Sequence, residues 1–129
     1  TKDPSKENEW GMGDSGYRID GEQNDRKHVR GVLSMARNGE DFNSASCQFF
    51  ICLDEAKSLD RLYTAFGRLI RGDNVLEAIG TTKTEFPPGG GGEKNRPVAR
   101  MGVETIRIVP RETLTKFNPS NPNANPKQL

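Results

Sequence analysis

Residues 31–67 read GVLSMARNGEDFNSASCQFFICLDEAKSLDRLYTAFG. Three apolar segments within and just beyond this stretch are typical of strands: Gly31–Ala36, Cys47–Leu53 and Tyr63–Ile70. The segment between the first two, Arg37–Ser46, is rich in Asn, Gly, Asp and Ser, which indicates a loop. We therefore expect a core of neighbouring strands joined by loops.

Working outward, Tyr17–Ile19 alternates and predicts a short strand, and Val103–Val109 alternates imperfectly and predicts the last one. A single helix is expected to start at Gly72-Asp73, with Asp73 as the N-cap and Gly80 as the C-terminal cap. Thr84–Pro97 contains two prolines in succession and four consecutive glycines, so it is predicted to be a flexible loop.

These segments amount to about five strands and one helix, and most of the strands follow one another too closely for crossover helices. The predicted class is therefore mainly β, antiparallel, of barrel or sandwich type, with one helix and long loops.

The length of 129 residues fits one domain. With 32% apolar and 29% charged residues the core is lean, and the chain ends contain few apolar residues. We assign residues 1–110 to the domain and residues 111–129, which repeat Asn and Pro, to a disordered tail that could serve for tethering.

The net charge of +1 comes from dispersed basic residues, so neither a nucleic acid nor a membrane partner is expected. No apolar run reaches the eighteen or so residues of a membrane span. Because the sequence starts at Thr1, we expect a processed or excised chain, with a cytoplasmic location favoured and export left open.

Several kinds of site are disfavoured. On a strand, Cys47 and Cys52 would lie on opposite faces about 16 Å apart, too far for a disulfide, so both are predicted to be small buried thiols without a metal. His28, among basic residues, is predicted to be a solvated surface group. The glycines at Gly89–Gly92 indicate a linker rather than a phosphate-binding loop.

A polar residue, Gln48, opens a run of large apolar ones, and a neighbouring strand ends with the small residue Ala36. This pattern could describe an apolar groove with convergent hydrogen-bonding groups, or an ordinary core strand whose first residue lies in solvent.

The motifs GVLSMA, SASCQFFI, LD and FG, in this order and spacing, resemble the cyclophilin family, and the similarity runs from about Asp3 to Val109. The resemblance implies a closed eight-stranded barrel of which this chain holds the C-terminal two-thirds. Open strand edges would then favour pairing with another copy or segment. It further implies a peptidyl-prolyl cis-trans isomerase that acts on proline-containing protein segments and assists folding without a cofactor. The alternative is a non-catalytic module that only binds such segments.

The resemblance also implies which residues bind substrate. Ala36 resembles the floor of the groove, and Gln48 resembles the glutamine that hydrogen-bonds the substrate backbone. Phe50 and Leu59 resemble two walls of the proline pocket, so they should converge on one concavity with the Gln48 amide at its rim.

Two further positions depart from the family pattern. Tyr63 stands where many members have a histidine, and Arg37 replaces an asparagine that usually contacts the substrate backbone. The catalytic arginine of the family lies in an FHR-type motif that these 129 residues do not contain, so no catalytic residue is assigned. We therefore expect the chain by itself to be a poor isomerase and a longer protein carrying that motif to be a competent one.

Overall fold

The computed structural model describes residue 5 and residues 13–87 and 92–111. The chain divides into two compact units, residues 1–99 and 100–129, and all the named helices and strands belong to the first. The predicted tail beyond residue 111 and most of the glycine run lie outside the described residues.

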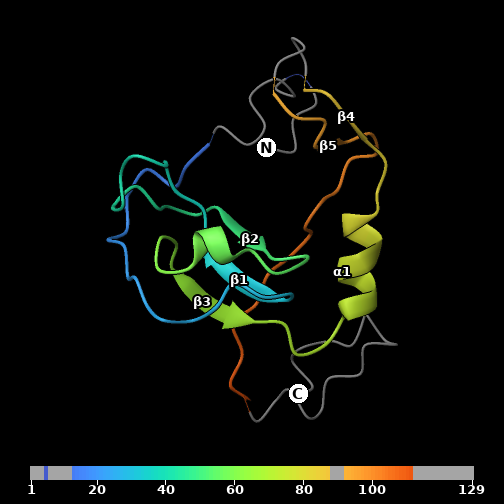
Figure 1. The fold of residues 1–129 in the computed structure, drawn as a ribbon. Helices are drawn as coiled ribbons and strands as arrows, with labels where there is room; N and C mark the ends of the chain where they lie inside the picture. Colours follow the sequence, from blue (N-terminus) through green and yellow to red (C-terminus); the bar gives the residue numbers. More distant parts are fainter. Residues whose placement is uncertain (1–4, 6–12, 88–91, 112–129) are drawn as a thin grey trace. The chain divides into compact units, whose positions relative to one another are not determined.

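A three-stranded antiparallel sheet forms the centre of the first unit (Figure 1). Its strands are β1 (Val32–Met35), β2 (Phe49–Ile51) and β3 (Ala65–Arg68), in the order β2-β1-β3. The three predicted core strands are thus confirmed, each shorter at its ends than the apolar run that indicated it.

The sheet buries one face only. Val32, Cys52 and Ala65 form its small core, and Phe50 packs against them half-buried. On the other face Phe49 and Phe66 are 43% and 50% exposed, and their rings meet edge to face at 6.4 Å. This second face is therefore apolar and open among the described residues.

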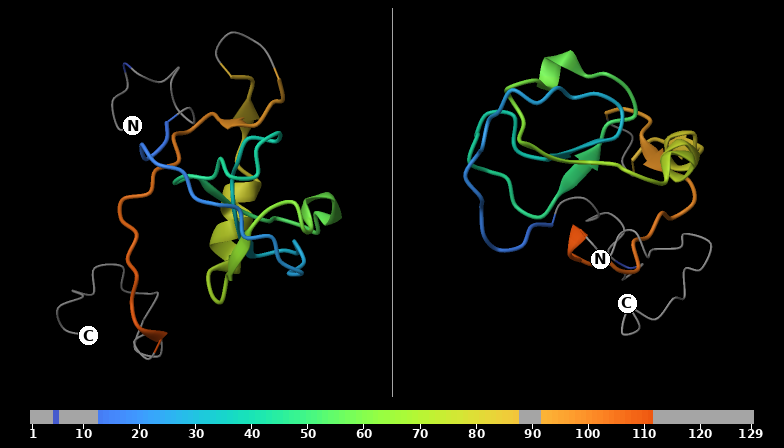
Figure 2. Two further views of the ribbon diagram at one scale, coloured as in Figure 1. Left: turned by 90° about the vertical axis from the view of Figure 1, so that its left-hand side faces the viewer. Right: turned by 90° about the horizontal axis from the view of Figure 1, so that it is seen from below.

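The helix α1 (Asp73–Gly80) stands beside the sheet (Figures 1 and 2). Arg30 ties it there: its guanidinium donates to Asp73 at 2.9 Å, to Glu77 at 2.7 Å and to the carbonyl oxygen of Leu53 at 2.8 Å. The predicted N-cap is one residue too late, because Gly72 occupies that position with a left-handed φ of 88°. Glycine adopts this φ without the steric cost that Asp73 would meet there.

After α1, two short strands pair antiparallel: β4 (Thr84–Glu85) and β5 (Arg96–Pro97). They are the two ends of the segment predicted to be a flexible loop. That prediction missed the pairing because two-residue strands give no detectable alternation.

The outer predicted strands are the clearest errors. Of Tyr17–Ile19, only Ile19 forms a bridge, to Ala45, with its N–H donating to the Ala45 oxygen at 2.8 Å. Val103–Val109 forms no strand, and within it Ile108 is fully exposed. Alternation predicts a strand only where a neighbouring strand accepts its hydrogen bonds, and no described segment pairs with this one.

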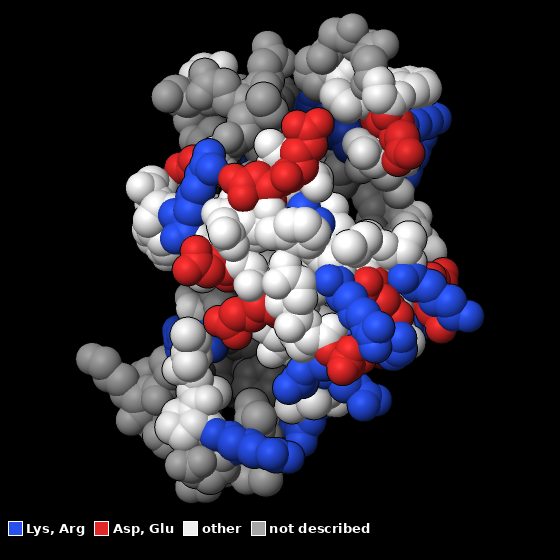
Figure 3. All heavy atoms as spheres, turned by 60° about the vertical axis from the view of Figure 1, so that its left-hand side comes forward, with Lys and Arg blue, Asp and Glu red and all other residues white. Residues whose placement is uncertain are grey.

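The two sheets of the described residues are not closed. The described elements are mainly strands, with one α-helix. No helix within the described ranges is long and apolar enough to cross a membrane. On the face drawn in Figure 3, acidic and basic side chains are interspersed rather than gathered by sign.

Candidate substrate-binding site

A pocket of about 200 Å³ opens where the loops at one end of the sheet meet. It is lined by Gly13, Asp14, Ala36, Arg37, Asn38, Ser44, Ser46 and Gln48. Three of the six predicted substrate-binding residues, Ala36, Arg37 and Gln48, therefore share one concavity.

The sheet register brings these residues together. Ala36 follows β1 and Gln48 precedes β2, and the N–H of Ala36 donates to the oxygen of Gln48 at 2.9 Å. This bond extends the β1–β2 ladder past its last strand pair, so the two residues stay side by side where the strands diverge into loops.

An earlier segment closes the other side of the pocket. The Gln48 amide Nε2 donates to the carbonyl oxygen of Gly13 at 2.7 Å. Two positions away, the N–H of Ser15 donates to the Ser46 hydroxyl at 3.0 Å, and the two hydroxyls lie 2.6 Å apart. The amide predicted to meet substrate thus already has a carbonyl partner, of the same chemical type as a substrate backbone carbonyl.

The predicted pocket walls do not line this concavity. Phe50 and Tyr63 meet edge to face at 6.0 Å, and Phe50 stacks on His28 at 6.2 Å. Leu59, half-buried at the end of the 3-10 helix Lys57–Leu59, accepts the N–H of Tyr63 at 3.1 Å. The structure therefore groups Phe50 and Tyr63 as a ring pair, with Leu59 holding the turn that leads to Tyr63.

The Arg37 side chain makes polar and aromatic contacts at the site. Its Nε donates to the carbonyl oxygen of Leu62 at 2.9 Å, and its Nη1 donates to those of Asn38 and Gly39 at 2.8 and 2.9 Å. Its guanidinium carbon lies 4.3 Å from the Phe42 ring centre and 4.5 Å from that of Tyr63.

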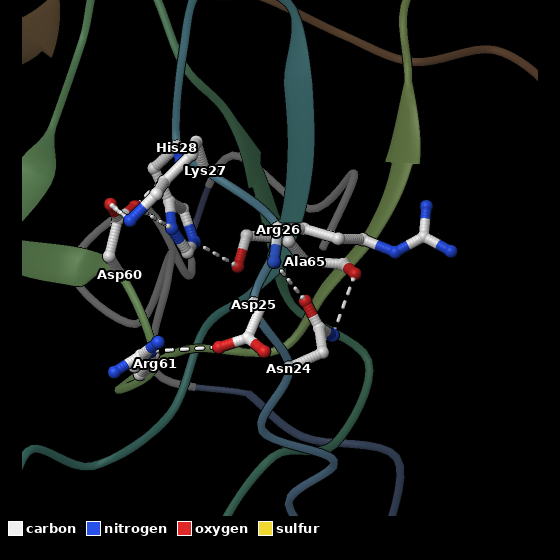
Figure 4. Close-up of polar contacts among 9 residues, drawn as sticks. Asn24, Asp25, Arg26, Lys27, His28, Asp60, Arg61 and Ala65 are labelled. Atoms are coloured by element: carbon white, nitrogen blue, oxygen red, sulfur yellow. Dashed lines mark hydrogen bonds and ion pairs between the residues drawn. The ribbon is translucent and has the colours of Figure 1, made fainter.

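His28 is not the solvated surface group that the sequence predicted, since it is only 1% exposed. Its Nδ1 lies 3.3 Å from Asp60 Oδ1 (Figure 4). Its Nε2 lies 3.0 Å from the hydroxyl of Ser34, which is fully buried. Ionised Asp60 can only accept, so in the neutral ring Nδ1 donates to Asp60 and Nε2 accepts from Ser34. The basic neighbours in sequence gave no hint of these partners.

The Ser–His–Asp order resembles a nucleophile relay, but burial excludes that chemistry because no substrate reaches a hydroxyl with no exposed surface. The arrangement instead satisfies polar groups behind Phe50. The backbone N–H of His28 donates to Asp60 at 2.8 Å, and this bond, followed by the ammonium of Lys27, lowers the pKa of Asp60 to about 2.

The two cysteines differ, which corrects the prediction that both are buried. Cys52 is buried, and burial raises the pKa of its thiol, whereas Cys47 is exposed because it precedes β2 instead of lying within it. Within the described ranges, no three His, Cys, Asp or Glu side chains gather in a way that could hold a metal ion.

Comparison with known proteins shows the family. A family model described as "Cyclophilin type peptidyl-prolyl cis-trans isomerase/CLD" matches residues 1–108. The chain belongs to this cyclophilin family. Its relatives include peptidyl-prolyl cis-trans isomerase CYP18-2 of Arabidopsis thaliana, 38% identical over 109 residues, which are 83% of this chain and 61% of that protein.

Two other cyclophilin relatives match over shorter stretches. Peptidyl-prolyl cis-trans isomerase CYP23 of Arabidopsis thaliana is 47% identical over 62 residues, which cover 48% of this chain and 27% of the relative. Peptidyl-prolyl cis-trans isomerase 10 of Caenorhabditis elegans is 38% identical over 79 residues, 61% of this chain and 44% of that protein. The chain thus spans less than two thirds of the length of these cyclophilins.

The sequence alone missed five pocket residues that come from loops: Gly13, Asp14, Asn38, Ser44 and Ser46. Loop residues reach a site through turns that have no periodic pattern, and the SASCQFFI motif, which contains Ser44 and Ser46, did not mark either of them as a site residue. The ring of Phe42 was missed for the same reason.

Proposed function

We propose that the protein to which this chain belongs is a peptidyl-prolyl cis-trans isomerase that acts on exposed X-Pro bonds and so assists protein folding. The observation that carries the proposal is the convergence of Ala36, Arg37 and Gln48 in one pocket, in a chain of the cyclophilin family. The ring pair Phe50–Tyr63 adds an apolar surface of the kind that holds a proline ring.

The proposed reaction makes and breaks no covalent bond, so the site has to act through the way it binds the X-Pro amide. Rotation about an X-Pro bond faces a barrier of about 18–20 kcal/mol because the amide nitrogen and carbonyl are conjugated. A site accelerates it by binding the twisted amide more tightly than the planar one. In the proposed site, Phe50, Leu59 and Tyr63 hold the proline ring, Ala36 leaves space, and Gln48 exchanges the Gly13 carbonyl for a substrate carbonyl.

The selective step needs a donor aimed at the proline nitrogen. Arg37 is a poor candidate, since its Nε and Nη1 already donate to three backbone carbonyls. We therefore propose that the 129 residues supply substrate binding and that the donor belongs to an FHR-type motif. The alternative function, a module that binds proline-containing segments without turning them over, is what this chain would show by itself.

We further propose that the open sheet is part of a cyclophilin-like β-barrel and that residues 1–110 form that domain, with residues 111–129 as a tail. The exposed rings of Phe49 and Phe66 support this, because apolar sheet faces and unpaired strand edges are normally covered or closed. Alone, the chain would cover them by self-association, which sedimentation at increasing concentration measures. A monomer at all concentrations would count against this.

The test of function uses a short Ala-Pro peptide and exchange NMR, with the intact relative CYP18-2 as a positive standard. We expect the chain to bind the peptide but to isomerise it on the order of 100- to 1,000-fold more slowly than the standard, the usual cost of one missing preorganised donor. Equal rates would refute the arginine-centred account, and absence of binding would refute the site itself.

Phe50→Ala is the matching site variant, and Phe66→Ala on the open face of the sheet is its control. Phe50→Ala should weaken peptide binding at least tenfold, since burying an aromatic ring contributes about 1.5–3 kcal/mol. Phe66→Ala should leave binding unchanged. Equal effects of the two variants would place the proline ring elsewhere.

A further inference from the structure

Arg37 joins two loops that are far apart in the sequence. Asn38 and Gly39, which accept from Nη1, start the loop after β1, whereas Leu62, which accepts from Nε, lies in the turn before β3. A single side chain therefore fixes the distance between two segments that are not neighbours in the sequence.

The same guanidinium starts a continuous series of ring contacts. Its carbon lies over Phe42 and Tyr63, Tyr63 meets Phe50 edge to face, and Phe50 stacks on the buried His28. His28 is in turn held by two buried or half-buried hydrogen-bond partners. The aromatic surface is thus anchored at both ends, at His28 by the core and at Arg37 by the loops.

We infer that Arg37 is a positioning residue, which orients Tyr63 and through it Phe50, rather than a direct ligand of the substrate. This rests on the proposed proline-peptide site and deepens it. Arg37 replaces an asparagine of the family pattern, so in this chain a polar contact to the substrate has been exchanged for a fixed aromatic surface.

The chemistry of arginine explains why another basic residue would not serve. The planar guanidinium donates in fixed directions and lies flat over rings at the same time. Lysine has the same charge but offers a compact ammonium on a flexible stem, so it could not hold three carbonyls and two rings together. The inference therefore predicts that charge alone does not preserve the site.

The test compares Arg37→Lys and Phe42→Leu in the 129-residue chain, with Arg68→Lys, at an exposed position of β3, as the matched control. Ring resonances of Tyr63 and Phe50 are recorded without peptide, and the dissociation constant of an Ala-Pro peptide is then measured. Arg37→Lys should move both sets of resonances and raise the dissociation constant about tenfold, a change between those expected for losing an exposed and a desolvated cation–π contact. Arg68→Lys should change neither.

Phe42→Leu separates the ring contact from the hydrogen bonds. Phe42 does not line the pocket, and its replacement removes a ring under Arg37 without removing any acceptor of the Arg37 hydrogen bonds. It should move the Tyr63 resonances and weaken binding severalfold. If Arg37→Lys retains full affinity and unmoved ring resonances, the positioning role is refuted. If it weakens binding while the rings stay unmoved, Arg37 is instead a direct ligand. If the unchanged chain binds no peptide, the proposed function fails, and the ring resonances still decide whether Arg37 orients Tyr63.

Discussion

Replacing Ser34 by alanine tests whether the buried His28 depends on its partner. Ser34 is fully buried and its hydroxyl lies 3.0 Å from His28 Nε2. Alanine leaves that ring nitrogen without a partner in a place that water does not reach, which costs about 1–3 kcal/mol. For a chain of this length the melting temperature should fall by roughly 3–12 °C.

A double-mutant cycle separates the hydrogen bond from packing. His28→Leu removes the ring and strands the Ser34 hydroxyl, and the double variant His28→Leu with Ser34→Ala removes both polar groups. Because two apolar replacements leave no unsatisfied partner between them, the double variant should be less destabilised than the sum of the singles by about 0.5–3 kcal/mol.

The assay is urea unfolding followed by far-UV circular dichroism at pH 7, with Ser58→Ala as the control at an exposed serine. Surface changes of this kind usually stay within about 0.5 kcal/mol. If Ser34→Ala were as mild as the control, or if the singles simply added, the buried bond would contribute nothing and the reasoning would be wrong.

Three further predictions concern the same unit. Since the pKa of Asp60 is lowered from 3.8 to about 2, the ionised carboxylate should stabilise the fold above pH 3.8, and this stabilisation should be lost as the pH falls from 3.8 to about 2. Asp60→Asn should make the urea midpoint depend less on pH across that window. An unchanged pH dependence would contradict the assignment. Gly31→Ala should destabilise by about 1–2 kcal/mol because the backbone φ is 83° and the new Cβ would lie 3.3 Å from Leu69 Cβ, whereas an unchanged urea midpoint would argue against a left-handed residue there. Arg30→Ala should speed amide hydrogen exchange in α1 but not in β1, since it releases Asp73, Glu77 and the Leu53 carbonyl; equal protection in both proteins would show that the helix is held by packing alone.

The sequence identified the central sheet because each short strand lies within a longer apolar run, and the first two runs are separated by a loop rich in Asn, Gly and Ser. Its failures have definite causes. A bulge between β1 and β3 pairs Leu33 with Gly67 and Ser34 with Ala65, so Phe66 is an extra residue and the simple alternation along β3 is broken. Val103–Val109 shows that alternation without a pairing partner does not make a strand.

The candidate site was predictable in part for a similar reason. Ala36, Gln48 and Phe50 lie within motifs whose spacing is fixed by two adjacent strands. The partner of His28, Asp60, is 32 residues away, a separation that no local pattern encodes. The ring contacts of Arg37 include Phe42, whose position is set by a loop. The sequence therefore showed that Arg37 departs from the family pattern, but it did not show which residues Arg37 contacts.

The segment at residues 13–15, which completes the pocket, is held by side-chain hydrogen bonds and not by the backbone ladder that holds the sheet. Gly13 and Ser15 reach Gln48 and Ser46 through hydrogen bonds that are all exposed, across separations of 31 and 35 residues. Bonds of this kind break in local openings that cost far less than global unfolding. Only the closed fraction of molecules has the complete pocket, and the apparent dissociation constant equals the intrinsic one divided by that fraction. Changes at Ser15 could therefore tune ligand affinity while the cooperative unfolding of the sheet stays the same.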